Sequence, residues 1–313
     1  MFGKCQRQWF YKNHVANANA TKKPLQREAY ILSKLQTVAA WRGKIVDHVI
    51  SLRIIPALEK GWDLRKGAVL DYARSIFDKQ REFAMLNRVR EPGMSQKKGG
   101  EAFAAFYAVD YGIGITKEEM DSAWRDVEKA ILTLLDTHEL LDLLRSADRL
   151  VAQRNLVFSI FQTKAKAVPD LIAFFRGEPP LIVDWKVHTF GTTDYRLQLA
   201  TYAVALVRCA PHQDFPADLS SYSPTDVRLL EAQLLTNVLR EYALIERDID
   251  DIESHIADTA MQMALAAGDG SSNQLNAFDF PATEYPENCE KCPFRALCWE
   301  EPTCQVSRQM TFL

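Results

Sequence analysis

The segment VPDLIAFFRGEPPLIVDWKV constrains the fold more than any other part of the chain, because it sets charged residues inside two apolar runs. Asp170 and Asp184 lie on either side of a turn predicted at 176–180. Alternate residues of a strand share a face, so Asp184 and Lys186 point the same way, and Asp170 can lie beside them on the neighbouring strand. The segment therefore predicts two adjacent strands that bring two carboxylates and a lysine to one spot.

This trio has a defined chemistry. Two neighbouring carboxylates repel each other and resist desolvation unless a cation joins them. Oxygen ligands suit Mg²⁺ or Mn²⁺, and a lysine beside the metal can orient a water or balance charge that develops on a phosphate. The Asp-x-Lys pattern alone recurs by chance, and its alternative interpretation is an edge strand with a surface salt bridge. That alternative fits poorly with LIVDWKV, where the charges stand among apolar neighbours.

Periodicity along the rest of the chain predicts an α/β protein with a helical block ahead of the sheet. Strands are expected over 155–162, 167–175 and 181–187, with a strand pair at 227–234 and 238–243. Helices are expected over 24–60, 62–91, 116–135, 138–150, 194–209 and 247–267. Residues 91–100 are rich in Gly, Ser and Lys, which indicates a loop, and 268–276 form a connector.

Charge is distributed unevenly along the 313 residues. The net charge is −3, but residues 1–100 contain 20 Lys and Arg against 8 Asp and Glu, whereas 101–313 contain 18 against 33. This asymmetry favours a basic, polyanion-binding face in the first third of the chain, although acidic C-terminal helices could simply neutralise it. The expected DNA-binding side chains in the 91–100 loop and just before it are Arg88, Arg90, Lys97 and Lys98. The alternative is a solvated loop that contacts nothing.

The chain begins without an apolar signal-peptide segment and contains no run long enough for a membrane helix, which favours a cytoplasmic location and no membrane partner. Its six cysteines are then unlikely to form disulfides. Cys289, Cys292 and Cys298 form a compact thiolate cluster that can hold a metal with a fourth ligand. Proximity in sequence favours Cys304 as that ligand, and Cys5 is the other candidate.

The run VPDLIAFF, LIVDWK and YRLQLATY resembles the RecB-type branch of the PD-(D/E)xK nuclease superfamily. The resemblance implies a restriction-endonuclease-like mixed central sheet flanked by helices. In that branch a Gln-x-x-x-Tyr motif follows the Asp-x-Lys strand and braces the DNA or the site, which Gln198 and Tyr202 match. An upstream motif supplies a metal-ligating histidine, and His48 in RGKIVDH fits it. The implied metal ligands are therefore His48, Asp170 and Asp184. Because one of them is a histidine, the site is expected to prefer Mn²⁺ to Mg²⁺.

The cysteines also resemble those of RecB-type nucleases of the AddAB and CRISPR-adaptation kinds. Those proteins hold a [4Fe–4S] cluster with one N-terminal and three C-terminal cysteines, which corresponds here to Cys5, Cys289, Cys292 and Cys298. The N-terminal match is CQRQWFY, although Gln6 stands where proline is common and the lead-in is short. Zn²⁺ uses the same thiolates and stays open as the alternative. Such a site would act as a structural clamp between the two ends of the chain.

Together these observations predict a metal-dependent DNA nuclease, expected to act as an exonuclease on single-stranded or end-containing DNA. The expected regions are 1–50 with the cysteine motif and ligand helix, 51–150 as a helical insertion, 151–267 as the catalytic core and 268–313 as the cysteine tail. A helicase or another repair or defence protein is a conceivable partner. The alternative interpretations are a catalytically silent DNA-binding or docking subunit and a zinc-bearing adaptor.

Overall fold

The computed structural model describes residues 2–20, 22–90, 96–160, 163–188, 195–268 and 275–299. The chain divides into two compact units that alternate along the sequence. The first unit, here called the cysteine unit, comprises Met1–Val38, Asp78–Lys117 and Thr259–Leu313. The second, here called the sheet unit, comprises Ala39–Phe77 and Glu118–Asp258.

A five-stranded mixed sheet forms the centre of the sheet unit, in the order β1-β4-β5-β6-β7. All neighbouring pairs are antiparallel except β5 and β6, which are parallel. Strands β2 and β3 form a separate antiparallel hairpin. The strands are β1 (Arg149–Ala152), β2 (Leu156–Ile160), β3 (Thr163–Ala167), β4 (Leu171–Phe175), β5 (Glu178–Lys186), β6 (Arg228–Gln233) and β7 (Val238–Tyr242).

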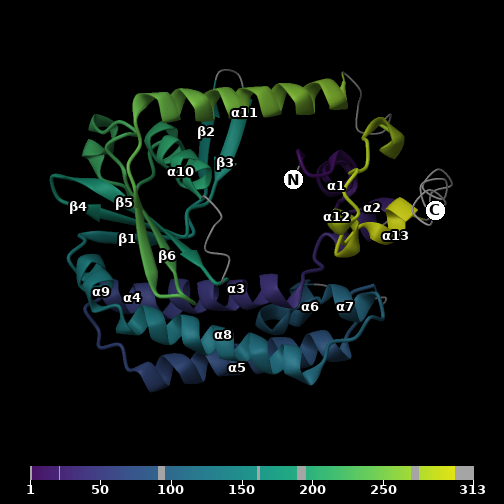
Figure 1. Ribbon diagram of the computed structural model, residues 1–313, viewed down its shortest axis with the longest axis horizontal. Helices are drawn as coiled ribbons and strands as arrows, with labels where there is room; N and C mark the ends of the chain where they lie inside the picture. The colour runs from purple at the N-terminus through teal and green to yellow at the C-terminus, as the bar shows by residue number, and fades with distance from the viewer. Residues whose placement is uncertain are drawn as a thin grey trace. The chain divides into compact units, whose positions relative to one another are not determined.

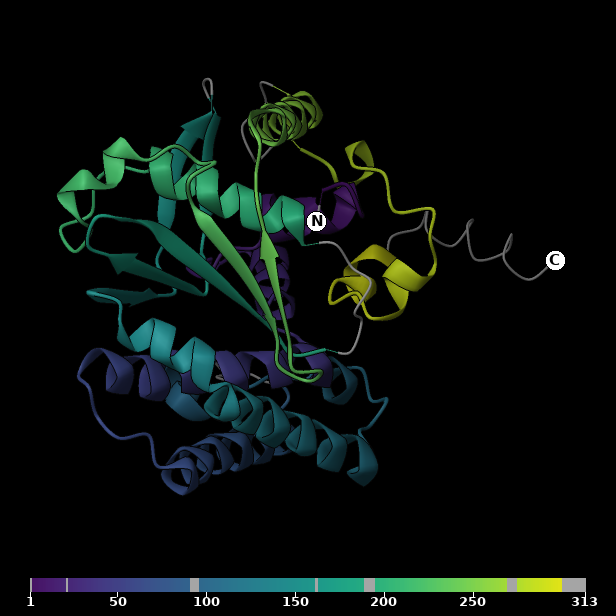
Figure 2. The same cartoon turned by 60° about the vertical axis from the view of Figure 1, so that its left-hand side comes forward.

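Helices cover both faces of this sheet, with α10 on one side and α3, α4, α8 and α9 on the other (Figures 1 and 2). Leu199, Ala203 and Val204 of α10 are fully buried against Ile172 and Ile182 of the sheet. The helices of this unit are α3 (Val38–Val49), α4 (Ile55–Glu59), α8 (Lys117–Asp136), α9 (His138–Arg145), α10 (Arg196–Arg208), and parts of α5 (Lys66–Leu86) and α11 (Glu246–Ala267). The predicted α/β class with a mixed sheet between helices is confirmed.

A stretch of π-helix, Ile50–Ile54, joins α3 to α4, so the chain stays helical from 38 to 59. Pro56 lies in the first turn of α4 and has no backbone N–H to donate. The wider π-helical turn before the proline accommodates the missing backbone hydrogen bond, so the helix does not end there. The single helix predicted over 24–60 is therefore correct from 38 onwards, whereas its beginning is a separate helix, α2 (Pro24–Leu32).

The cysteine unit contains the end of α5, the end of α11 and several short helices from distant parts of the chain. The short helices are α1 (Gln6–Phe10), a π-helical turn (Tyr11–Val15), α2, α6 (Gln96–Gly99), α7 (Tyr107–Asp110), α12 (Glu287–Glu290) and α13 (Arg295–Trp299). Figure 1 shows α1 beside the segment that leads to α12. Phe10 stacks on Phe280 with ring centroids 4.5 Å apart, and both rings are buried. This aromatic packing joins the two ends of the chain.

Several local expectations differ from the structure. Two strands were not predicted: β1 begins within the helix expected over 138–150, and β3 falls between the strands expected over 155–162 and 167–175. Strand β5 begins at Glu178, so the turn is limited to Arg176 and Gly177, and Gly177 supplies the left-handed conformation with φ of 73°. Residues 96–99 are helical rather than a loop, whereas 91–95 lie outside the described residues. In the described part of the chain, no helix has the length and apolar content needed to span a bilayer.

Candidate active site and cysteine cluster

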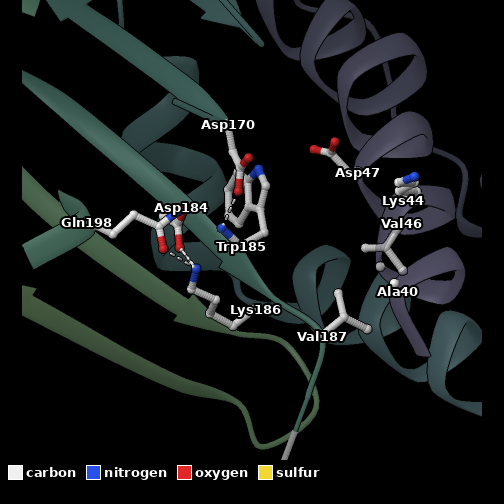
Figure 3. A pocket seen from close by; sticks show the side chains of 11 residues that line it. Ala40, Lys44, Val46, Asp47, Asp170, Asp184, Trp185, Lys186, Val187 and Gln198 are labelled. Carbon is white, nitrogen blue, oxygen red and sulfur yellow. Dashed lines mark hydrogen bonds and ion pairs between the residues drawn. The ribbon is translucent and has the colours of Figure 1, made fainter. Parts of the chain in front are cut away.

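The antiparallel pairing of β4 with β5 brings the two aspartates of the sequence motif together. Leu171 pairs with Val183, and the next pair outward in that register is Asp170 with Asp184. The backbone N–H of Trp185 donates to Asp170 Oδ2 at 2.9 Å, which fixes that carboxylate against the neighbouring strand (Figure 3). The predicted proximity of Asp170, Asp184 and Lys186 therefore follows from strand register alone.

The two aspartates belong to a row of polar side chains that crosses the sheet. Asp184 pairs with Glu231 on β6, and Glu231 pairs with Arg240 on β7. At the other edge, the backbone N–H of Gln153, just after β1, donates to the Asp170 carbonyl oxygen at 3.0 Å. We call Gln153, Asp170, Asp184, Glu231 and Arg240 the polar row. The preceding row on the same face, Val151, Ile172, Ile182, Leu229 and Tyr242, is largely apolar.

Glu231 is completely buried within this row and its charge is locally satisfied. The Tyr242 hydroxyl donates to Glu231 Oε2 at 2.6 Å, the Gln233 amide donates to Oε1, and Arg240 lies 3.6 Å from the same oxygen. Glu231 carries no signal in the sequence, because an acidic residue within a strand is not a motif. Its partners in the fold make it a structural carboxylate beside the site.

Helix α3 supplies the wall that faces the two aspartates across a cavity of about 300 Å³ (Figure 3). Ala40, Gly43, Lys44 and Asp47 line the cavity, at spacings of three and four residues that place them on one stripe of the helix. Arg42 anchors the helix here, because it forms an ion pair with Asp126 and donates to the Val187 carbonyl oxygen at 2.9 Å. Asp47 thus adds a third carboxylate to the cavity.

Lys186, Gln198 and Tyr202 form a hydrogen-bonded chain around Asp184. Lys186 Nζ forms an ion pair with Asp184 and donates to Gln198 Oε1 at 3.0 Å. Gln198 Nε2 donates to Asp184 Oδ1 at 3.2 Å and to the Tyr202 hydroxyl at 2.6 Å. Because residues four apart lie on the same side of a helix, α10 presents Gln198 and Tyr202 together. Lys186 also lies 4.0 Å above the Tyr195 ring.

The three cavity carboxylates have perturbed acidity. Burial raises the pKa of Asp47, Asp170 and Asp184 to about 6 in each case. A neighbouring carboxylate contributes to each rise. The pKa of Asp47 is raised by Asp184, that of Asp170 by Asp47, and that of Asp184 by Asp170. Lys186 opposes this rise for Asp170 and Asp184. One lysine therefore does not balance three carboxylates, which is the electrostatic condition that favours cation binding.

These residues fit a divalent metal by their chemistry, since three carboxylates form a hard oxygen donor set. In the described part of the chain, no three His, Cys, Asp or Glu side chains lie close enough together to hold a metal ion as they stand. To share a cation, the three carboxylates would have to draw closer together.

His48 is not among the described residues that line the cavity. Its Nε2 lies 3.1 Å from the Tyr72 hydroxyl, and the two rings stack with centroids 6.1 Å apart. Adjacent residues of a helix point about 100° apart, so Asp47 and His48 do not face the same cavity. The structure brings together Asp170, Asp184, Lys186, Gln198 and Tyr202 of the predicted site and directs His48 to Tyr72 instead.

The raised carboxylate pKa values predict that the metal-free protein loses stability as pH rises. A folded-state pKa of about 6 exceeds the ordinary value of 3.8, so the folded chain binds more protons than the unfolded chain between these pH values. The free energy of unfolding should therefore fall between pH 4 and pH 7, by on the order of 2 kcal/mol for each of these carboxylates. Urea denaturation in EDTA at several pH values measures this. Asp47→Asn should flatten the fall, and an equally steep fall in that variant would contradict the assignment.

In the cysteine unit, Cys5, Cys289, Cys292 and Cys298 line one cavity although they come from the two ends of the chain. Burial raises the pKa of the Cys292 thiol to about 11, and Cys5 and Cys289 raise it further. A thiol with this pKa is neutral at pH 7, and a bound cation would stabilise its thiolate. Soft sulfur donors of this kind suit an iron–sulfur cluster or Zn²⁺. Cys304 lies outside the described residues.

The support around these thiols comes from both ends of the chain and from α7. Arg7 Nε donates to the carbonyl oxygens of Ala277 and Phe280 at 3.1 Å each, and its Nη1 lies 3.8 Å from Cys298 Sγ. The hydroxyls of Tyr107 and Tyr111 donate to the Glu290 and Pro293 carbonyl oxygens at 2.6 and 2.8 Å. The loop that carries Cys289 and Cys292 is therefore held by hydrogen bonds from α7 and from the residue that follows it.

The predicted DNA-binding residues are exposed in the cysteine unit. Arg88 and Arg90 directly precede the segment outside the described residues, and Lys97 and Lys98 are part of α6. The Arg90 guanidinium lies over the Tyr111 ring, 5.0 Å from its centroid. Arg90 is therefore partly committed to the support of the cysteine loop.

Comparison with known proteins identifies the family. The crystal structure of a protein named SSO0001 is similar over 72% of this chain and 96% of its own, with 14% sequence identity and a TM-score of 0.30. No curated protein matches the sequence. The family model of the PD-(D/E)XK nuclease superfamily matches residues 2–299, which include every element described above. The chain therefore belongs to the PD-(D/E)XK nuclease superfamily.

Proposed function

We propose that this chain is a metal-dependent deoxyribonuclease of the RecB-type branch, acting as an exonuclease on single-stranded or end-containing DNA. The observation that carries the proposal is the cavity in which Asp47, Asp170 and Asp184 meet Lys186 and Gln198. Three carboxylates and a paired lysine match the requirements of phosphodiester hydrolysis, in which a metal and a cation face a phosphate. Mg²⁺ or Mn²⁺ is the proposed metal.

Each side chain has a defined task in this proposal. Asp47, Asp170 and Asp184 hold the cation, which when bound lowers the pKa of water and offsets negative charge. Lys186 orients the attacking water and stabilises the charge that grows on the phosphate. Gln198 keeps Lys186 and Asp184 in place through its two hydrogen bonds, and Tyr202 fixes the orientation of the Gln198 amide. The site is thus ordered by contacts among its own residues.

In this proposal Asp47 takes the place that the sequence motif assigned to His48. Asp47 lines the cavity, whereas the His48 ring contacts Tyr72. The change matters for metal preference, because an all-carboxylate donor set suits Mg²⁺ as well as Mn²⁺. Nuclease activity with Mg²⁺ as the only divalent cation is therefore part of the expected behaviour.

Asp47→Asn and His48→Ala form a matched pair that tests this exchange. The amide introduced by Asp47→Asn retains an oxygen that can accept the Gln153 hydrogen bond but loses the charge, so metal affinity and cleavage rate should fall by about 10- to 100-fold. His48→Ala should change the rate by less than about threefold, within the usual range for residues outside a site. Cleavage rates against Mn²⁺ concentration measure both. The reverse order of effects would restore His48 as the ligand.

The proposed second cofactor is a structural [4Fe–4S] cluster held by Cys5, Cys289, Cys292 and Cys298. It is supported by the shared cavity of the four thiols, which come from both ends of the chain. Absorbance near roughly 400 nm and matching iron and sulfide content are expected for this cluster. Stoichiometric zinc without iron would instead support the zinc alternative.

A nuclease assay on end-labelled DNA tests the function directly. Purified chain is incubated with Mg²⁺ or Mn²⁺ and with linear single strands, linear duplexes or circular single strands. Release of short products from linear substrates, with the circle left intact, is expected of an exonuclease. Cutting of the circle would assign an endonuclease, and the absence of cleavage on every substrate would support a silent DNA-binding subunit.

Exposed basic residues Arg88, Lys97 and Lys98 are proposed to contribute affinity for DNA. A helicase or other repair or defence protein is the proposed kind of partner.

A further inference from the structure

Gln153 adopts a backbone conformation that glutamine rarely takes. Its φ is 51°, in the left-handed region, and among the described non-glycine residues only Asn237 shares this feature. A residue with a Cβ atom is destabilised in this region by about 1 kcal/mol or more. Such a conformation persists where the surrounding contacts impose it, and it is a reason to examine what the side chain does.

The side chain of Gln153 joins two carboxylates from different parts of the sheet unit. Its Nε2 donates to Asp47 Oδ1 at 2.8 Å and to Asp170 Oδ1 at 3.1 Å. An amide nitrogen has two hydrogens, so both are committed to these acceptors. The backbone N–H of the same residue donates to the Asp170 carbonyl oxygen. Gln153 therefore holds Asp170 by two hydrogen bonds and reaches helix α3 by a third.

From this geometry we propose that Gln153 is a positioning residue that holds Asp47 and Asp170 ready to receive a divalent cation. This inference rests on the proposed metal-dependent nuclease function. Asp47 lies on a helix and Asp170 at the start of a strand, and like charges on separate elements move apart unless something links them. The amide links them without adding charge. The two carboxylates then move less when a cation binds. Residues that hydrogen-bond to metal ligands raise metal affinity in this way.

The simpler interpretation is that Gln153 only satisfies two buried oxygens and ends strand β1. Under that interpretation the residue affects stability but leaves the metal affinity of the folded protein unchanged. The left-handed backbone distinguishes the two, since glycine would end the strand with less strain. A glutamine at this position indicates that its amide is required.

Gln153→Gly separates these interpretations because glycine accepts the backbone conformation while it removes the side chain and its amide. Asn237→Gly is the matched control, since it changes the other described left-handed residue, which lies in the turn between β6 and β7. Isothermal titration of each full-length variant with Mn²⁺ measures affinity in the folded state. Gln153→Gly should weaken Mn²⁺ binding by about 10-fold or more, whereas Asn237→Gly should leave it unchanged. The Mn²⁺ concentration for half-maximal cleavage should rise in parallel, with less change in kcat at saturating Mn²⁺.

Two further variants make the result decisive. Gln153→Asn keeps an amide in a residue that tolerates φ above zero, but it is one methylene too short to reach both carboxylates, so an intermediate affinity is expected. Asp184→Ala must itself weaken Mn²⁺ binding, and if it does not, the proposed metal site is wrong. If Asp184→Ala weakens binding while Gln153→Gly binds Mn²⁺ as tightly as the wild type, the site stands and the role of Gln153 is overturned. Equal losses in Gln153→Gly and Asn237→Gly would also overturn it.

Discussion

Replacing Lys186 with alanine will reduce the cleavage rate by at least about 100-fold, while DNA binding changes little. Lys186 is nearly buried, with 11% of its side chain exposed, and its ammonium group is held between Asp184 and Gln198. A cation in so fixed a position stabilises charge that develops during reaction more than charge already present on bound DNA. The loss should therefore appear in kcat, measured under substrate saturation, and not in the dissociation constant of DNA.

Lys44→Ala is the control for this prediction, because Lys44 lines the same cavity from helix α3 but is exposed. Its loss should alter cleavage by less than about tenfold, in line with the modest effect of an exposed charge. Circular dichroism and thermal melting establish that both variants are folded. A Lys186→Ala protein that cleaves DNA at nearly the wild-type rate would remove Lys186 from the chemistry and with it the proposed mechanism.

Cys5→Ser should have the same consequences as Cys292→Ser, although the two cysteines lie at opposite ends of the sequence. Both should lose iron and lower the melting temperature by roughly 10 °C, since a link across nearly the whole chain stabilises by about 5 kcal/mol in the chain-entropy model. Activity should fall as well, because loss of the link favours the unfolded chain. Iron and sulfide content together with calorimetry measure these effects.

Cys209→Ser serves as the control for cysteine loss. Cys209 follows helix α10 in the sheet unit, where its thiol donates to the Leu206 carbonyl oxygen at 3.3 Å. This variant should keep its iron and most of its stability. Cys304→Ser distinguishes the two candidates for the fourth ligand: a Cys5→Ser protein with full iron content, together with iron loss in Cys304→Ser, would assign Cys304 instead of Cys5.

The centre of the site could be predicted because its geometry follows from local sequence. A turn between two apolar runs places Asp170 opposite Asp184, and alternation along β5 puts Lys186 on the same face. The spacing of Gln198 and Tyr202 likewise requires only a helix. Such relations depend on short segments, so that periodicity and one turn are sufficient to predict them.

Asp47 and Gln153 could not be predicted in the same way. Asp47 and His48 are adjacent on α3, and sequence periodicity does not indicate which of them faces the sheet. The spacing of Ala40, Gly43 and Asp47 on one stripe is a signal in favour of Asp47, but it becomes informative only once the cavity is known. Gln153 shows no signal at all, because left-handed positions are expected at Gly or Asn and its two acceptors are distant in sequence.

The support of the cysteine loop is similarly hidden. Tyr107 and Tyr111 lie between the helices expected over 62–91 and 116–135, and both donate hydrogen bonds to residues about 180 positions further along the chain. Contacts of this range depend on how separate segments meet, which no local pattern encodes. Part of the long helical stretch ahead of the sheet therefore has a structural task in the cysteine unit.

The polar row also has a consequence for how the sheet assembles. A shift of β5 or β6 by one residue would turn Asp184 or Glu231 to the opposite face, among residues such as Leu181 and Val183, which are buried. Each misplaced carboxylate would then lose its hydrogen bonds inside an apolar layer, at a cost of about several kcal/mol. Misaligned pairings are thereby selected against during folding. Residues proposed to hold a metal for phosphodiester hydrolysis thus also exclude incorrect strand alignments.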